Sequence, residues 1–222
     1  MWQVTQTIKM TQIIVRENSS DDVIIAECRD YNRRCKPDKK DVWMDIGAHI
    51  GVFTCLIAPK VKHVYSYEPE PENFGLLKDN IEANGLKNVS AYNSAVVADE
   101  QPTHDNFYVY DNTNTGLHSF KQRPNGKVKD TLTVSCENIN AIIGDCQITG
   151  IKMDCEGMEY ELLKAIRPEY WKQIRELIFE FHPTLYEDGK AKRDEIIQLL
   201  RDKFILFNVI PKDDVVLIYG RR

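Results

Sequence analysis

The sequence predicts an α/β fold with a mostly parallel seven-stranded sheet and helices on both faces. Three observations support this prediction. From residue 42 onward, short apolar segments alternate with amphipathic ones, which is typical of parallel strands joined by crossover helices. The first apolar segment ends in an acidic residue and a glycine turn, as expected where a strand meets a ligand. The last two apolar segments flank a short polar turn, so they are predicted to form a hairpin with an antiparallel terminal strand.

The expected helices separate the strands. A helix at about 50–58 lies between the first two strands. Pro71 opens the next helix, at a position that proline favours, and Gly85 is expected to end it. Residues 196–200 mark a later amphipathic helix. The predicted strands are 42–46, 64–68, 89–93, 148–153, 176–181, 204–209 and 215–219.

The chain before the first sheet strand is interpreted as a separate segment. Residues 1–40 are predicted to be an N-terminal cap on a main domain at 41–222. Within the cap, the apolar runs 13–15 and 23–26 are predicted to form a short strand pair across a polar turn.

A second segment interrupts the alternation of strands and helices. Residues 99–135 are rich in turn-forming residues, and the runs 107–110 and 132–134 can pair as strands. A long insertion near the ligand end of a sheet is typical of a substrate lid. We therefore expect a lid-like insertion at about 99–135.

Composition excludes several classes of protein. The formal net charge is −5, so no broad basic surface is expected and nucleic acid is a poor candidate partner. No run of residues approaches the ~20 apolar residues of a membrane span. The six cysteines form no C-x-x-C pair and no zinc-type spacing, so we expect reduced, structural thiols in the cytoplasm. The chain is also compatible with a domain of a longer protein.

The glycine turn indicates a nucleoside ligand. Asp45, Gly47 and Gly51 form a D-x-G-x-x-x-G turn, and Glu68 follows Gly47 after 21 residues. That spacing fits a strand–helix–strand unit in which a nucleoside lies on the turn and its ribose hydroxyls meet the second acid.

The same turn argues against a dinucleotide. The NAD motif needs a middle glycine for close approach of a pyrophosphate, and Ala48 and His49 occupy that region here. Asp45 adds a negative charge that would repel a pyrophosphate. An acid there suits a ligand with a sulfonium and an ammonium group, which predicts S-adenosylmethionine (SAM).

Further motifs lie toward the C-terminus. The string K-x-D-x-E-G-x-E is the most specific of them, because no common structural role accounts for it. Together the motifs resemble those of the FkbM-type methyltransferases, a family of class I SAM-dependent O-methyltransferases, over residues 42–183. The motifs are 45–54 (DIGAHIGVFT), 68–69, 73–74, 84–85, 151–159 (IKMDCEGME) and 179–183 (FEFHP).

The resemblance implies a Rossmann-like fold and methyl transfer from SAM to a hydroxyl, often on a sugar or polyketide. Its members include glycan-modifying enzymes, so a hydroxyl of a sugar or glycan is the expected acceptor. His49 departs from the family, which usually has asparagine there.

The cofactor-binding residues are predicted along the first three strands. Asp45 and Gly47 are assigned to the methionine part of SAM, and Gly51 to close packing of the helix. The two oxygens of Glu68 suit the two ribose hydroxyls. Loop residues after the third strand are expected to line the adenine. The predicted set is Asp45, Gly47, Ala48, His49, Gly51, Glu68, Pro69, Asn93, Ser94 and Ala95.

The predicted catalytic residues are Asp154, Glu156, Glu180 and His182, at the ends of the fourth and fifth sheet strands. Ligands of open α/β sheets bind at the carboxyl ends of strands. Glu156 is expected to open the helix after the fourth strand. Asp154 or His182 is the candidate base that removes the acceptor proton.

Two questions stay open at the level of sequence. Residues 154, 156 and 180 could instead hold a divalent metal, although no metal is predicted. The alternatives to a glycan methyltransferase are an enzyme for a lipid or polyketide hydroxyl and a catalytically silent SAM-binding module. An NAD oxidoreductase is the weakest alternative, because the middle glycine is missing.

Overall fold

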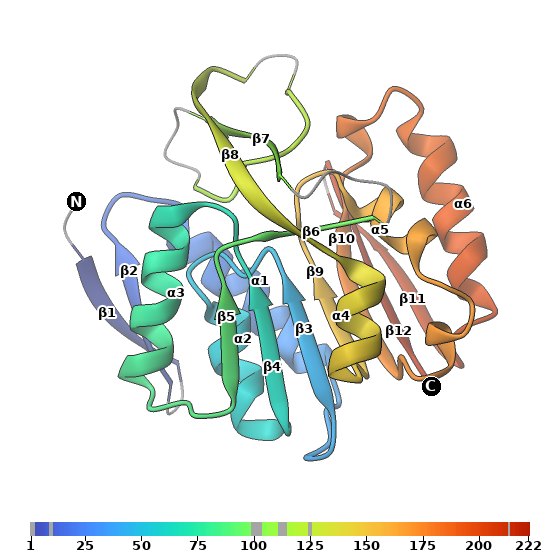
Figure 1. Cartoon of the computed structure of the whole chain (residues 1–222), viewed down its shortest axis with the longest axis horizontal. Coiled ribbons are helices and arrows are strands. Elements are labelled where there is room, and N and C mark those ends of the chain that lie inside the picture. The colour runs from blue at the N-terminus through green and yellow to red at the C-terminus, as the bar shows by residue number, and fades with distance from the viewer. Residues whose placement is uncertain (1–2, 9–10, 99–103, 111–114, 124–125, 213) are drawn as a thin grey trace.

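The computed structural model describes residues 3–8, 11–98, 104–110, 115–123, 126–212 and 214–222. A seven-stranded sheet forms its centre (Figure 1). β12 runs antiparallel to both of its neighbours, and the remaining pairs are parallel. The predicted fold, including the C-terminal hairpin, is therefore confirmed. The strand order is β11 (Leu206–Pro211), β12 (Val216–Arg221), β10 (Glu176–Phe181), β9 (Gly150–Met153), β3 (Val42–Ile46), β4 (His63–Tyr67) and β5 (Val89–Tyr92).

Helices cover both faces of this sheet. In Figure 1, α4 and α5 lie in front of the sheet, and α1 and α2 lie behind it. Pro71 begins α3, as predicted, and Gly85, with φ +60°, lies two residues beyond the last residue of the helix. The helices are α1 (Asp21–Arg34), α2 (Val52–Ile57), α3 (Pro71–Ala83), α4 (Ile139–Cys146), α5 (Glu159–Ala165) and α6 (Gly189–Arg201). Short 3-10 turns occupy Ala58–Lys60, Tyr170–Lys172 and Pro183–Leu185.

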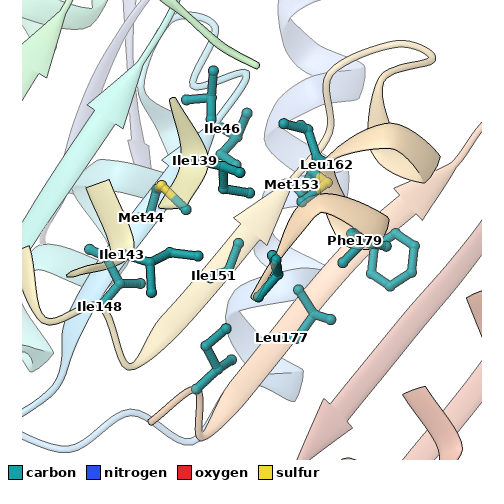
Figure 2. Packing of buried hydrophobic residues seen from close by; sticks show 14 of the residues in the cluster. Met44, Ile46, Ile139, Ile143, Ile148, Ile151, Met153, Leu162, Leu177 and Phe179 are labelled. Carbon is teal, nitrogen blue, oxygen red and sulfur yellow. The ribbon is translucent and has the colours of Figure 1, made fainter. Parts of the chain in front are cut away.

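Alternation along the strands divides the core into two layers. On β10, Leu177 and Phe179 pack toward α4, α5 and α6, whereas Ile178 packs toward α1 and α2. Successive side chains of a strand point to opposite faces, so a strand buried on both faces reads as one apolar run. Figure 2 shows the first of these layers, with Met44 of β3 and Ile151 of β9 next to each other.

The N-terminal segment differs from the prediction. β2 (Thr11–Arg16) pairs with β1 (Gln3–Ile8), and residues 23–26 belong to α1. The predicted strand at 23–26 is therefore wrong. The β-branched run favoured a strand, but the buried apolar positions of the segment are Ile25, Cys28 and Tyr31, which have helical spacing.

The insertion contains the predicted strand pair. β7 (His104–Tyr110) and β8 (Val128–Asn138) are antiparallel, with Phe107 opposite Leu132. β6 (Ala95–Val97) adds to the other side of β8. In Figure 1 this small sheet stands above the upper ends of the strands of the large sheet, which are the carboxyl ends of its parallel strands.

Two further expectations can be compared with the structure. All six cysteines lie outside any disulfide, as expected of reduced thiols. Within the described ranges, no helix has the length and apolarity needed to cross a membrane.

Candidate active site

A cavity of about 360 Å³ lies at the carboxyl ends of β3, β9 and β10. Residues of α1 and of the insertion also line it, so segments distant in sequence form its walls. We call Gly47, Ala48, His49 and Glu68 its turn end. We call Asp154, Glu156, Glu180 and His182 its acidic end.

The turn after β3 requires glycine at two positions. Gly47 has φ +69°, and a Cβ there would lie 1.8 Å from the backbone oxygen of Asp154. Gly51 has φ +84°, and its Cβ would lie 2.5 Å from Cδ1 of Leu77. The turn is anchored to β4, because the backbone N–H groups of Gly47 and Ala48 both donate to the Tyr67 carbonyl. The turn therefore lies close to both β9 and α3.

Asp45 lies beneath the cavity rather than on its wall. Its side chain is fully buried and forms an ion pair of 3.2 Å with Lys152, and it accepts a 2.7 Å hydrogen bond from Thr54. Lys152 also donates to the Gly47 carbonyl at 2.6 Å and lines the cavity. The structure thus places Asp45 as the partner of the lysine that supports the glycine turn.

Glu68 directly follows β4, and its carboxylate lies against the glycine turn, as its spacing predicts. Its carboxylate accepts hydrogen bonds from the backbone N–H of His49 at 2.8 Å and of Glu70 at 3.0 Å. The residue is 5% exposed and lines the cavity. Burial raises the pKa of Glu68 to about 7, although the two backbone hydrogen bonds oppose this rise.

The four predicted residues next along the chain have different positions. Pro69 and Ala95 line the cavity. The Asn93 side chain donates to the Glu68 and Pro69 carbonyls, and Ser94 donates to Glu137. Asn93 and Ser94 therefore fix the loop, while the neighbouring Val96, which the sequence analysis missed, lines the cavity.

His49 joins the turn to the insertion. Its Nε2 lies 2.9 Å from the Thr115 hydroxyl and 3.3 Å from Nη2 of Arg16. Arg16 in turn pairs with buried Asp21 at 2.9 Å. Burial lowers the pKa of His49 to about 3, and the charge of Arg16 contributes, so this imidazole is neutral.

The structure brings the four predicted catalytic residues together at the acidic end. Asp154 and His182 directly follow β9 and β10, and their side chains approach to 3.9 Å. Nε2 of His182 lies 3.5 Å from Glu156, which also pairs with Arg123 of the insertion. Glu156 does not open a helix as predicted; it lies in a turn with φ +54°, and α5 begins three residues later.

Glu159 is a member of this site that the sequence analysis did not assign. It is fully buried, contacts Nδ1 of His182 at 3.0 Å, and accepts from the Gly157 N–H. Burial would raise the pKa of Glu159, but the imidazolium of His182 lowers it. Its place at the end of the K-x-D-x-E-G-x-E string was the available signal.

Charge at the acidic end decides between the two candidate bases. Burial would lower the pKa of His182, but Glu159, Glu156 and Asp154 raise it to about 10. An imidazolium at neutral pH has no lone pair for a proton, which counts against His182 as the base. Burial raises the pKa of Asp154, and nearby Glu180 adds to this. A raised pKa is the direction of shift that a carboxylate general base at neutral pH requires.

Glu27 is a second residue missed by the sequence analysis. It projects from α1 into the cavity wall. Burial raises its pKa to about 7, with contributions from the charges of Glu180 and Asp154. The sequence analysis predicted a strand at 23–26, which gave no reason to place Glu27 at the cavity. The helix α1 directs this side chain toward the acidic end.

The donor set of the acidic end also has the composition of a cation site. One oxygen of Asp154, one oxygen of Glu180 and one nitrogen of His182 lie within 4.8 Å of one another. Lys212 contacts Glu180 from the β11–β12 hairpin.

The order and directions of the strands define a Rossmann-like fold, which this chain shares with solved methyltransferases. The model of the methyltransferase FkbM domain matches residues 45–204, so the chain belongs to this family of SAM-dependent methyltransferases.

Three similar proteins illustrate the relationship. Methyltransferase 1 of Beauveria bassiana (strain ARSEF 2860) is 22% identical over 190 residues, covering 77% of this chain and 75% of its own. The crystal structure of an FkbM methyltransferase from Methylobacillus flagellatus KT aligns with a TM-score of 0.54 and 18% identity, over 84% of this chain and 45% of that one. A putative methyltransferase from Streptococcus mutans, solved with S-adenosylhomocysteine (SAH), has a TM-score of 0.50 and 9% identity, over 90% and 97% of the chains.

Proposed function

We propose that this protein is an O-methyltransferase that transfers the methyl group of SAM to a hydroxyl of a sugar or glycan. The observation that carries the proposal is the concentration of carboxylates at the acidic end, where Asp154, Glu156 and Glu180 line the cavity. Sugar hydroxyls donate hydrogen bonds, and carboxylates accept them. The same negative charges repel phosphate groups, which disfavours a nucleic-acid acceptor.

The cavity fits the donor in size and chemistry. Its volume of about 360 Å³ lies within the range of small-molecule sites, roughly 300–1,000 Å³. We assign the ribose to Glu68 and the adenine to the wall formed by Ala95 and Val96. The sulfonium and ammonium groups would then point toward the carboxylates of the acidic end. Asp45 acts through Lys152, which holds the glycine turn in place.

SAM supplies an electrophilic methyl group when it is bound. The chain has to align an acceptor oxygen behind that methyl and remove the acceptor proton. We assign proton removal to Asp154. We assign orientation of the acceptor to Glu156 and Glu180, which Arg123 and Lys212 hold in place.

The residues of the insertion support a lid role. Arg123 pairs with Glu156, and Ser119 donates to the Glu156 carbonyl at 2.5 Å. Thr115 bonds to the turn through His49. The described part of the insertion is thus fastened to both ends of the cavity, as a cover that excludes water from methyl transfer requires.

A lipid or polyketide hydroxyl is the second candidate acceptor. The apolar side chains Phe107, Leu117 and Phe120 of the insertion line the same cavity and would suit an apolar acceptor. We favour the sugar, because these side chains lie on the insertion, whereas carboxylates occupy the strand ends.

A screen of acceptors tests the proposal. The purified full chain is incubated with SAM and with panels of free sugars, oligosaccharides, hydroxy fatty acids and polyketide alcohols, and the products are read by mass spectrometry. We expect addition of one methyl to a sugar hydroxyl, and its loss in Asp154→Asn. Methylation confined to apolar acceptors would overturn the glycan assignment. SAM binding without turnover on any panel would favour a catalytically silent module.

A further inference from the structure

We propose that Asp154, Glu180 and His182 form a binding site for a divalent cation of the Mg²⁺ or Mn²⁺ class. One ligand atom of each residue lies within 4.8 Å of the others. Opposite ligands of an octahedral ion are roughly 4 Å apart, since its bonds are about 2.0–2.1 Å long. Small side-chain rotations therefore suffice to bring all three atoms onto one ion.

The scaffold under these three residues is rigid. Asp154 and His182 directly follow β9 and β10, which pair with each other, and Glu180 lies within β10. The Asp154 N–H also donates to the Ile46 carbonyl at 3.1 Å, which extends the sheet hydrogen bonding past the strand. Ligands on paired strands keep their relative positions without help from loops.

A separate observation concerns the orientation of His182. The residue is 6% exposed, and its Nδ1 contacts Glu159, which is itself fully buried. This contact leaves Nε2 facing the acidic end, 3.5 Å from Glu156 and 3.9 Å from Asp154. Within the described part of the chain, Nε2 has these two contacts with carboxylates and makes no hydrogen bond. A carboxylate behind a histidine is the usual outer-shell arrangement of a metal-ligating imidazole.

The charges around the site call for a cation. Six acidic side chains surround the site. Among the described residues, three basic side chains form ion pairs with them: Lys152, Arg123 and Lys212. Three of these acids therefore have no lysine or arginine partner in that part of the chain, and a buried carboxylate without such a partner is costly to ionise. A divalent ion together with the net positive charge of SAM would balance them. The six acidic side chains in or directly beneath this end are Glu27, Asp45, Asp154, Glu156, Glu159 and Glu180.

The donor types select the class of metal. The two carboxylates suit hard ions such as Mg²⁺ and Mn²⁺, the imidazole favours Mn²⁺ as the softer of the two, and no thiol belongs to this group of ligand atoms. Lys212 contacts Oε1 of Glu180, and the carboxylate has a second oxygen for an ion. A metal ion takes the place of the proton on Nε2, because ligation requires the neutral imidazole.

The role of such an ion rests on the proposed function, whereas its binding does not. At the acceptor position, a divalent cation would lower the pKa of a bound hydroxyl and orient its oxygen toward the methyl group. Asp154 would then serve as a ligand as well as a neighbour of the acceptor.

Direct titration with Mn²⁺ tests the site without any acceptor. Free Mn²⁺ is measured by electron paramagnetic resonance as the metal-free full chain is added. We expect one ion per chain, with affinity at least tenfold weaker in Asp154→Asn and in Glu180→Gln. Glu159→Gln should weaken binding by about 10–100-fold, the usual effect of losing an outer-shell partner. Asp194→Asn, which alters an exposed acid on α6, should leave the affinity unchanged.

Thermal unfolding of the unaltered protein provides a second measurement that needs no variant. Mn²⁺ in large excess over its Kd should raise Tm. Absence of Mn²⁺ binding up to millimolar concentration, or binding as tight as that of the unaltered chain by folded Asp154→Asn and Glu180→Gln, would overturn the metal site. Methyl transfer to a sugar that persists in EDTA would leave the proposed function standing and refute a metal in the reaction. Binding of Mn²⁺ without methyl transfer to any acceptor would leave the metal site standing and refute the proposed function.

Discussion

The turn end of the cavity is built mainly from backbone, whereas the acidic end is built from charged side chains. At the turn end, Gly47 and Ala48 donate to the Tyr67 carbonyl, and the Glu68 carboxylate is held by two backbone N–H groups. At the acidic end, His182 lies among the carboxylates of Asp154 after β9, of Glu156 in the turn before α5 and of Glu159 at the start of α5. One end fixes shape and the other concentrates charge.

This difference predicts different consequences of substitution. A change at the turn end alters conformation, so its effect should appear in stability and donor binding. A change of charge at the acidic end that preserves shape should appear in turnover. Four measurements test this division, taken from the largest expected effect to the smallest.

Asp154→Asn should separate chemistry from binding most clearly. Asparagine has the same shape but no charge, so turnover should fall by about 10²–10⁴, the range for loss of acid–base help. Affinity for SAH, measured by calorimetry, should stay within a few-fold. Asp194→Asn is the matched control on the surface. Full turnover in the Asp154 variant would mean that the acceptor binds elsewhere.

Gly47→Ala should damage the turn end through conformation alone. The new Cβ would lie 1.8 Å from the Asp154 backbone oxygen, at a residue with φ +69°. We expect a free energy of unfolding lower by at least about 1–3 kcal/mol, the cost of overpacking, and loss of SAH binding. Gly75→Ala is the control, because its Cβ meets nothing within 4 Å in helix α3. That change should be neutral or stabilise by up to about 1 kcal/mol. Chemical denaturation measures both, and equal stability of the two variants would contradict the close approach at the turn.

Glu68→Ala should weaken the donor complex while turnover at saturating SAM changes less. A charge-assisted hydrogen bond contributes roughly 1.5–3 kcal/mol, and 1.4 kcal/mol corresponds to about tenfold in affinity. SAM affinity should therefore fall at least about tenfold in calorimetry. Glu72→Ala, an exposed acid in the first turn of α3, is the matched control. Unchanged SAM affinity in a folded Glu68 variant would remove the ribose assignment.

The raised pKa of Glu68 predicts that stability and SAM affinity depend on pH, with an effect smaller than those of the three substitutions. Its pKa is raised from 4.5 to about 7 by burial, so the folded chain holds this proton more tightly than the unfolded chain. The stabilising contribution of the proton is complete below pH 4.5 and is lost as the pH rises through about 7. SAM affinity should change in the opposite direction and increase up to about pH 7, since the ionised carboxylate accepts the ribose hydroxyls. Glu68→Gln should flatten the profile of SAM affinity and reduce the loss of stability with pH, part of which remains because Glu27 also has a pKa of about 7. Profiles identical to those of the unaltered chain would show that another group titrates.

Much of the fold could be predicted because its signals are local. The parallel strands read as short apolar runs, and the proline and glycine flanking α3 marked its ends. The failure at 23–26 has a physical cause: β-branched residues favour a strand locally, but packing of Ile25, Cys28 and Tyr31 against the core stabilises a helix. Local propensity cannot report which face of a segment finds a partner.

By itself, the sequence determined the turn end of the cavity, because Gly47 and Glu68 belong to one strand–helix–strand unit with a fixed spacing. It also placed Asp154 and His182 at strand ends, which are neighbours in any parallel sheet of this order. Only the tertiary structure decided that Asp45 pairs with Lys152, that Glu159 orients His182, and that Glu27 reaches the cavity. These contacts join side chains from separate elements, and their distances and charge states depend on how the elements pack. Their chemistry is therefore a property of the folded chain and not of any one motif.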